Sequence, residues 1–398
     1  MEKDMQSYRL SDLVKIKNGK DHKMLSNGKY PVLGSGGIMR YVDKFLYDKP
    51  SVLLPRKGTL DNIQYCDVPF WTVDTLYYTE VNTNLANPYY LYRYLSLLDL
   101  SNLDSGTGVP SMTFDNYYGL KIFLPNIEKQ TKIAQILQTL DKKIIINRQI
   151  NQNLEAIAKQ LYDYWFVQFD FPNEEGKPYK SSGGAMVWNE KLKRDIPVSW
   201  ETKAIEDIAD VYNGATPSTV NEQNYGGDIV WITPKDLSDQ KQKYVYQGER
   251  NISQVGYNSC STHLLPPNTI LMSSRAPIGL LSIAKTELCT NQGFKSFVPK
   301  AENISTYLYY YLNIHIKQIE QLGTGTTFKE VSREDVLKFP ILKPNDAILD
   351  LWEERVSAFN NKQFEIQKEN ECLTKQRDKL LPLLMNGQVS VNSDLSLD

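Results

Sequence analysis

The chain has 398 residues, which is too long for one ordinary domain and suits two domains with connecting elements. Its 41% hydrophobic and 23% charged residues are typical of a protein that buries real cores, and no apolar run approaches the ~18 residues of a membrane span. The net charge of −2 excludes a uniformly basic nucleic-acid binder, so a DNA-binding surface has to be a local patch or shared with a basic partner.

Cysteine and histidine usage argues against metal and disulfide chemistry. The four cysteines are scattered, with no histidine nearby at ligand spacing, and the three histidines are isolated. We therefore expect reduced structural thiols and no metal site. The N-terminal residues lack the apolar core of a signal peptide, so we expect a cytoplasmic protein with no membrane partner.

The first half of the chain predicts a mixed α/β domain. LSDLVKIKNGK (10–20) indicates a short helical turn, a strand and an Asn-Gly turn. KYPVLGSGGI (29–38) indicates a strand that runs into a glycine-rich loop, and SVLLPRKG (51–58) a buried strand that ends in an arginine-bearing loop. YLYRYL (90–95) has the apolar spacing of a packed helix with its tyrosines mostly in the core, and LKIFLP (120–125) predicts a strand before a long helix.

The same series of elements returns in the second half. IEDIADVYNGA (205–215) matches the opening segment at an offset of 195, so Asn213-Gly214 repeats Asn18-Gly19. YLYYYL (307–312) matches YLYRYL at an offset of 217, and TILMSSRAPIG (269–279) corresponds loosely to the earlier arginine-bearing loop. The two halves are therefore predicted to be two versions of one unit that differ mainly in their loops.

Each half ends in a long helix with a mostly apolar seam. Seam positions alternate four and three residues apart, which is a heptad spacing. Every position in the second helix is the first plus 219, so the two seams are expected to pair, and asparagines inside them would fix the register at some cost in stability. The predicted seam consists of Ile133, Leu137, Leu140, Ile144, Asn147, Asn151, Leu154, Ala158, Leu161 and Trp165 with Trp352, Val356, Phe359, Gln363, Ile366, Asn370, Leu373, Arg377, Leu380 and Leu384.

The predicted fold is α/β (mixed α+β). Two similar globular domains are separated by two long helices that form an intramolecular antiparallel coiled coil with pseudo-two-fold symmetry. The predicted segments are a first domain (1–126), a first spacer helix (127–166), a connector (167–199), a second domain (200–343), a second spacer helix (344–387) and a C-terminal tail (388–398).

No credible active site emerges from the sequence. Asn87-Pro88-Tyr89-Tyr90 is similar to the Asn-Pro-Pro-Tyr loop of amino-methyltransferases, but the second proline is absent and the second half lacks the motif. An asparagine N-cap followed by a proline at the first helical position explains it better. An orphan or fused DNA methyltransferase or nuclease that uses Asn87-Pro88 is the alternative function, and a coiled-coil scaffold without DNA affinity is a third.

Candidate binding residues are easier to find. GTGVPSMT (106–113) and GTGTTFKEVS (323–332) combine glycines with hydroxyls that suit phosphate oxygens, although tight turns need the same glycines. Arginines at strand ends either read guanine edges or are merely solvated. The candidate DNA-binding residues are Lys20, Ser35, Arg40, Arg56, Lys57, Thr107, Ser111, Thr113, Lys235, Ser273, Ser274, Arg275, Thr324, Thr326, Thr327, Lys329 and Arg333.

Over its whole length the chain resembles the specificity (S) subunit of type I restriction-modification systems. The connector WFVQFDFPNEEGKPYKSSGG (165–184) with DIPVSW (195–200), the closing LLPLLMNGQV (380–389) and the Gly-Thr-Gly loops are similar to the corresponding parts of that family. The resemblance implies that residues 1–126 and 200–343 are target recognition domains, each reading one half of a bipartite, asymmetric site in double-stranded DNA.

The resemblance also implies partners. A non-catalytic subunit of this kind directs two modification (methyltransferase) subunits, which methylate adenine, and restriction (nuclease and translocase) subunits are the further partners that the resemblance implies. S-adenosylmethionine and ATP are then expected on the partner subunits only, and this chain is expected to bind no cofactor.

Overall fold

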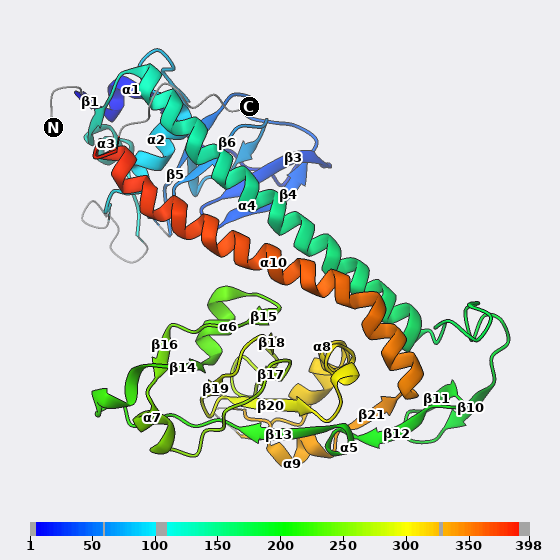
Figure 1. Ribbon diagram of the computed structural model, residues 1–398. Coiled ribbons are helices and arrows are strands. Elements are labelled where there is room, and N and C mark those ends of the chain that lie inside the picture. Colours follow the sequence, from blue (N-terminus) through cyan, green and yellow to red (C-terminus); the bar gives the residue numbers. More distant parts are fainter. Residues whose placement is uncertain (1–4, 59, 101–109, 326–328, 390–398) are drawn as a thin grey trace. The chain divides into compact units, whose positions relative to one another are not determined.

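The computed structural model describes residues 5–58, 60–100, 110–325 and 329–389 (Figure 1). The chain divides into two compact units, each with one mixed α/β domain and parts of both long helices. Unit 1 comprises Met1–Asn147 and Glu369–Asp398, and unit 2 comprises Arg148–Lys368. The division therefore cuts each long helix between its ends, whereas the segments proposed from the sequence follow the helix ends.

Unit 1 contains a four-stranded sheet in the order β2-β8-β5-β6, a three-stranded sheet in the order β4-β3-β7 and the pair β1-β9. Its strands are β1 (Gln6–Arg9), β2 (Val14–Lys17), β3 (Asn27–Gly34), β4 (Gly37–Val42), β5 (Ser51–Pro55), β6 (Gln64–Cys66), β7 (Trp71–Thr72), β8 (Leu76–Val81) and β9 (Lys121–Leu124). Its short helices are α1 (Leu10–Leu13), α2 (Pro88–Leu95) and α3 (Phe114–Tyr118).

Unit 2 repeats this plan with a five-stranded sheet in the order β13-β20-β17-β18-β15, a three-stranded sheet in the order β16-β14-β19 and the pair β12-β21. Its strands are β12 (Glu201–Ala204), β13 (Ala209–Asn213), β14 (Tyr225–Ile232), β15 (Tyr244–Val245), β16 (Arg250–Ile252), β17 (Ile270–Ser273), β18 (Leu281–Ala284), β19 (Cys289–Thr290), β20 (Phe294–Pro299) and β21 (Pro340–Lys343). Its helices are α5 (Ile205–Ile208), α6 (Pro234–Gln240), α7 (Gln254–Asn258), α8 (Ser305–Gln321) and α9 (Arg333–Leu337), with 3-10 turns η3 (Glu222–Asn224) and η4 (Glu302–Ile304).

The opening segments of both units confirm the predicted helical turn and strand. In α1 the carboxylate of Asp12 accepts the backbone N–H of Arg9 at 2.8 Å, and in α5 Asp207 accepts that of Ala204 at the same distance. The shared register extends to the sheets, because Val14 pairs with Val81 and its counterpart Ala209 pairs with Pro299. The repeat read from the sequence is thus a repeat of backbone pairing.

Glycine follows each opening strand because the backbone passes too close to a neighbouring strand for a side chain. A Cβ atom on Gly19 would lie 2.0 Å from the carbonyl oxygen of Val73, and one on Gly214 would lie 2.1 Å from that of Thr290. Neither glycine has a positive φ, so close approach, rather than the turn predicted from the Asn-Gly pair, explains the requirement.

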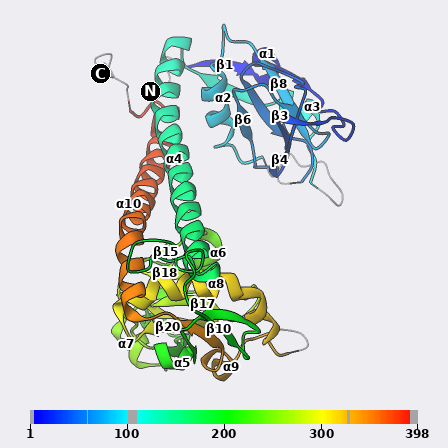
Figure 2. The same cartoon turned by 90° about the vertical axis from the view of Figure 1, so that its right-hand side faces the viewer.

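The long helices α4 (Ile127–Tyr162) and α10 (Asp346–Met385) run side by side in Figures 1 and 2. In unit 1 Asp141 contacts Arg377 at 3.0 Å and Asn147 contacts Glu369 at 2.7 Å. In unit 2 Asn151 donates to the carbonyl of Gln363 at 3.2 Å. Along these contacts the residue numbers increase in α4 and decrease in α10, so the two helices pair antiparallel. Every seam position named from the sequence is buried or half-buried.

Each domain packs on both long helices within its own unit. In unit 1 the core joins Leu10 and Tyr90 to Ile133 of α4 and Leu384 of α10. In unit 2 Tyr162 at the end of α4, Trp165 in the turn that follows it and Trp352 of α10 pack with the domain's tyrosines. The tyrosines of YLYYYL are at most 6% exposed, which confirms that they are core residues.

The connector follows a π-helical turn, η2 (Asp163–Val167), at the end of α4. It contains the hairpin β10 (Met186–Asn189) and β11 (Arg194–Pro197). Arg194 donates to the carbonyl of Val167 at 2.7 Å and lies over the ring of Phe169 at 4.4 Å, which fixes the hairpin to the end of the helix.

Candidate nucleic-acid interface

In unit 1 a basic loop meets the segment that follows the Gly-Thr-Gly sequence. Arg56 and Lys57 leave β5 directly, and Lys57 forms an isolated antiparallel bridge with Ser111. The amide of Met112 donates to the carbonyl of Arg56 at 3.0 Å. Residues more than fifty positions apart in the sequence are thereby held on one surface.

Unit 2 has the same arrangement. We call each pairing of the loop after the buried strand with the segment after the Gly-Thr-Gly sequence a junction. Arg275, two residues after the end of β17, forms the equivalent bridge with Glu330, and the amide of Val331 donates to the carbonyl of Ser274 at 3.1 Å. This register makes Lys57 the counterpart of Arg275, and Arg56 the counterpart of Ser274. The loose match between these two loops in the sequence had not assigned this register.

The two junctions carry different charges. In unit 1 Arg56 lies 5.9 Å from the ring of Tyr77, and Lys57 is exposed. In unit 2 the exposed Arg275 contacts Glu330 at 2.9 Å, and the buried Lys295 contacts the same carboxylate at 3.3 Å. Two cations on one carboxylate leave a net positive charge at the surface, which suits phosphate or a guanine edge.

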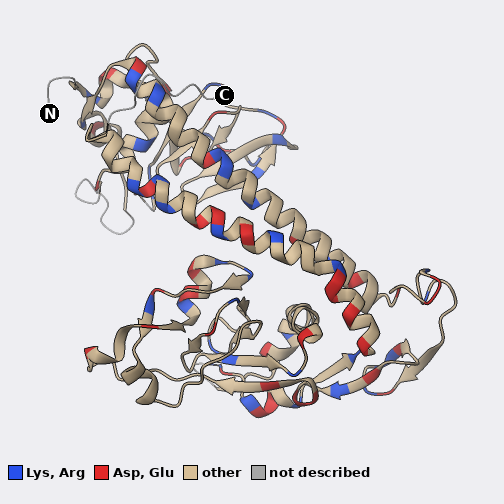
Figure 3. Cartoon of the chain, in the orientation of Figure 1, with Lys and Arg blue, Asp and Glu red and all other residues tan. Residues whose placement is uncertain are grey.

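Lys295 was not identified from the sequence. It is 4% exposed in β20, a strand whose neighbours are buried, and its amine also lies 3.4 Å from the hydroxyl of Ser274. A lysine in a strand whose other residues are apolar except for Ser296 was the available signal, because such a charge needs a buried partner. Figure 3 shows that elsewhere acidic and basic residues are interspersed.

Other candidates of unit 1 lie beside its junction or support the local fold. The amide of Ser35 donates to the hydroxyl of Thr75 at 3.4 Å, and the carbonyl of Thr75 accepts the amide of Arg56 at 2.9 Å. Ser35 and the basic loop are therefore neighbours. By contrast, the hydroxyl of Thr113 caps α3, and the guanidinium of Arg40 donates to the carbonyl of Leu25.

Lys20 is an exposed side chain beside β7. Its amide donates to the carbonyl of Thr72 at 2.8 Å, and its carbonyl accepts the indole N–H of Trp71 at 2.8 Å. Two hydrogen bonds thus hold the backbone of Lys20, but no contact of the described residues places its ammonium group at the junction.

Several candidates of unit 2 serve the fold. Ser273 and Ser274 are fully buried, and the Ser273 hydroxyl donates to the carbonyl of Pro277 at 2.6 Å, so neither offers its side chain to DNA. We exclude both from the interface. Arg333 donates to the carbonyl of Val211 at 2.6 Å, and Lys235 on α6 forms an exposed ion pair with Glu249.

The remaining candidates lie along the Gly-Thr-Gly segments. The amide and carbonyl of Thr324 both pair with Glu330 at 3.0 Å, and Lys329 is exposed next to it. These residues join the junction of unit 2. Thr107, Thr326 and Thr327 lie outside the described residues.

The structure explains Asn87-Pro88 without catalysis. The side chain of Asn87 accepts the amides of Tyr89 at 3.0 Å and Tyr90 at 3.1 Å, and Pro88 begins α2. This is an ordinary helix N-cap. Among the described residues, no three His, Cys, Asp or Glu side chains gather in a metal-binding cluster, and no helix is long and apolar enough to cross a membrane.

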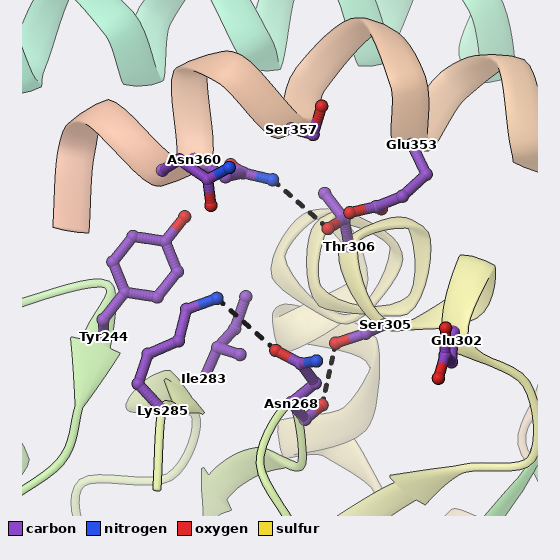
Figure 4. Close-up of a pocket in the computed structure, with 11 residues that line it drawn as sticks. Tyr244, Asn268, Ile283, Lys285, Glu302, Ser305, Thr306, Glu353, Ser357 and Asn360 are labelled. Atoms are coloured by element: carbon purple, nitrogen blue, oxygen red, sulfur yellow. Dashed lines mark hydrogen bonds between the residues drawn. The ribbon is translucent and has the colours of Figure 1, made fainter.

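A cavity of about 60 Å³ lies in unit 2 where α8 and α10 meet the domain (Figure 4). Tyr244, Lys285, Glu353 and Asn360 contribute polar atoms to it. Burial lowers the pKa of Lys285 and raises the pKa of Glu353. Because one buried water needs roughly 10–15 Å³, this cavity suits a few waters and is too small for a nucleotide cofactor.

Comparisons with known proteins agree with this architecture. The family model described as "Type I restriction modification DNA specificity domain" matches residues 2–156 and 197–371, which together are most of the chain. The solved S subunit of a type I restriction-modification system from M. genitalium superposes with a TM-score of 0.66 at 16% identity, covering 96% of each chain. That likeness concerns the fold.

Relatives with assigned names match over different extents. The MjaIX specificity subunit of Methanocaldococcus jannaschii is 39% identical over 182 residues, which is 45% of this chain and 42% of that relative. The HindI specificity subunit of Haemophilus influenzae is 29% identical over 373 residues, covering 78% of this chain and 79% of that relative. With both halves matched by the family model, the chain belongs to the type I restriction-modification DNA specificity family, whose members recognise DNA and are not themselves the enzymes.

Proposed function

We propose that this chain reads a bipartite, asymmetric site in double-stranded DNA, with unit 1 contacting one half-site and unit 2 the other. The observation that supports this most directly is the repeated junction. Lys57 beside Ser111 and Arg275 beside Glu330 occupy equivalent backbone positions but differ in side chain. Equivalent frames with different residues are what two readers of different sequences need.

The chain would act in the cytoplasm as the DNA-reading member of a complex. Two modification subunits would methylate adenine with S-adenosylmethionine, and restriction subunits would add an ATP-dependent nuclease. Methylation requires the target base to leave the stack, so a separate enzyme has to be held beside each reader. Near-neutral net charge fits this division, because partner subunits can supply part of the positive surface that grips the phosphates.

The proposal is tested by methylation of DNA by the complex with its modification subunit. We expect one bipartite motif to be methylated, and no methylation by this chain alone with S-adenosylmethionine. Exchange of residues 200–343 for the second domain of a relative should change one half-site and leave the other unchanged. Methylation by the isolated chain, or a change in both half-sites, would overturn the proposal.

A further inference from the structure

A single buried lysine joins four elements of unit 2. The side chain of Lys243 is 9% exposed, and its amine lies 2.8 Å from the Glu155 carboxylate of α4 and 2.8 Å from the Tyr310 hydroxyl of α8. The same amine lies 3.1 Å from Asn360 and 3.3 Å from Gln363, both on α10. The loop before β15 is thus tied at one point to both long helices and to the domain's own helix.

The surroundings of this amine reinforce the tie. The ring of Tyr310 lies 4.7 Å from the Lys243 amine, so the cation also faces an aromatic surface. Asn360 continues the network by donating to the hydroxyl of Thr306 at 3.3 Å (Figure 4). Gln367, two turns beyond Asn360 along α10, donates to the carbonyl of Tyr244 at 2.8 Å.

Unit 1 has its own network at the corresponding place. Arg93 of α2 is 8% exposed and pairs with Asp141 of α4, which also accepts the hydroxyl of Tyr89. Arg377 of α10 contacts the second oxygen of Asp141 at 3.0 Å. In both units, therefore, the domain supplies a cation, α4 supplies a carboxylate and α10 completes the contact.

The residues of the two networks are not interchangeable. At the repeat offsets of 217 and 219, the position of Arg93 is taken by Tyr310, and that of Asp141 by Asn360. Replacing a whole buried ion pair by apolar residues is often neutral or stabilising, whereas removing one partner leaves the other charge buried and unpaired, which is destabilising. Stability alone therefore gives little reason to keep such a network, but directional hydrogen bonds do fix an orientation.

We propose that these two networks are orientation locks, which set the direction in which each recognition domain leaves the helix pair and so restrict the spacing of half-sites that the protein accepts. This inference rests on the proposed function. Adding or removing one base pair from a spacer both translates and rotates a half-site, so a domain held rigidly rejects it and a domain free to tilt accommodates it. Lys243 and Arg93 are then positioning residues that need not touch DNA.

The test uses the complex with its modification subunit and a set of sites whose half-sites are constant and whose spacer is cognate, one base pair shorter or one longer. Two variants are compared with the wild type: Lys243→Met alone, and Lys243→Met combined with Glu155→Leu, which replaces the pair by apolar side chains. Lys203→Met is the matched control, because Lys203 forms a solvent-exposed pair with Glu201 in the same unit.

We expect the double variant to methylate the same half-sites but to lose roughly tenfold of its preference for the cognate spacer, which corresponds to ~1.4 kcal/mol. The control should keep the wild-type preference. The lock would be overturned if the double variant kept the wild-type spacer preference or methylated altered half-sites. It would also be overturned if both variants were inactive in an intact complex. Failure of the wild-type complex to methylate any bipartite site would instead refute the proposed function.

Discussion

At the scale of single residues, the junction of unit 2 contains an exposed residue that can contact a base and other residues that hold it in place. Arg275 is exposed but held by Glu330, which in turn is held by the buried Lys295. A guanidinium oriented in this way loses less side-chain freedom when it meets a base or phosphate. In unit 1 the corresponding Lys57 has no such carboxylate at position 111, where a serine stands, so we expect unit 1 to depend less on a charged base contact.

Arg275→Ala should weaken methylation through the half-site read by unit 2 by roughly ten- to a hundredfold, because a good base contact is worth ~1–3 kcal/mol. Lys300→Ala is the control. Lys300 follows the far end of β20 and bonds to the carbonyl of Glu206, away from the junction. Competition methylation with sites mutated in each half would measure the effect. An equal loss from both variants would contradict a specific role for Arg275.

Glu353 predicts a pH dependence of stability. Burial raises the pKa of its carboxyl, and one of its oxygens has no hydrogen-bond partner among the described residues. Between the unfolded and the folded pKa of this carboxyl, the folded protein therefore binds more protons than the unfolded chain, and stability falls as the pH rises from the unfolded pKa through the folded one. Glu353→Gln removes this titration, so the variant should gain about 1 kcal/mol at neutral pH.

Thermal unfolding at acid and neutral pH would check this prediction. The difference between the variant and the wild type should grow as the pH rises, and Glu354→Gln, at the neighbouring exposed position of α10, should show no such trend. A variant that is less stable than the wild type at neutral pH would mean that the Glu353 carboxylate makes a contact that outweighs its burial.

At the scale of elements, the sequence predicted what depends on local patterns. The heptad seam is visible in the sequence because its apolar positions repeat every seven residues. The Asp12 and Asp207 turns are visible because each carboxylate bonds to an amide three residues away. The loop register was not predictable in this way. It depends on which residue of a distant segment bridges Lys57 in unit 1 or Arg275 in unit 2. A shift of one residue would put a neighbouring residue of each loop at the bridge instead. The role of Lys295 was not predicted for the same reason, because its carboxylate partner, Glu330, lies 35 residues further along the chain.

The close-approach glycines give a test of the repeated backbone frame. Gly19→Ala and Gly214→Ala should each destabilise their own unit by about 1–3 kcal/mol, since the new methyl group collides with a strand carbonyl that cannot move independently. Gly36→Ala is the control, because nothing lies within 4 Å of its Cβ position. Urea unfolding would measure all three. Wild-type stability of the Gly214 variant would show that the strand can yield.

At the scale of the whole molecule, the helix pair carries the register. Asn147 is 2% exposed and bonds to Glu369, and Asn151 bonds to the backbone of Gln363. Polar contacts inside an apolar seam penalise every shifted alignment, because a shift leaves these groups buried without partners. Since the pairing is antiparallel, a change of length in one helix has to be matched in the other.

This constraint determines how the spacer can be re-engineered. Seven residues inserted in phase in both helices, between Asn147 and Asn151 in α4 and between Gln363 and Glu369 in α10, preserve the seam on either side. At 1.5 Å per residue the pair grows by about 10 Å, which is roughly three base pairs at 3.4 Å each. We expect the methylated motif to keep both half-sites and to gain about three base pairs of spacer.

An insertion in α4 alone is the informative comparison. It displaces Asn151 from Gln363 by two helical turns and leaves buried amides unpaired, so methylation should be lost and not shifted to a longer site. Sequencing of methylated sites separates the outcomes. If the single insertion lengthened the spacer as well as the paired one does, or if the paired insertion changed the half-site sequences, then the helix pair would not set the distance between the two readers.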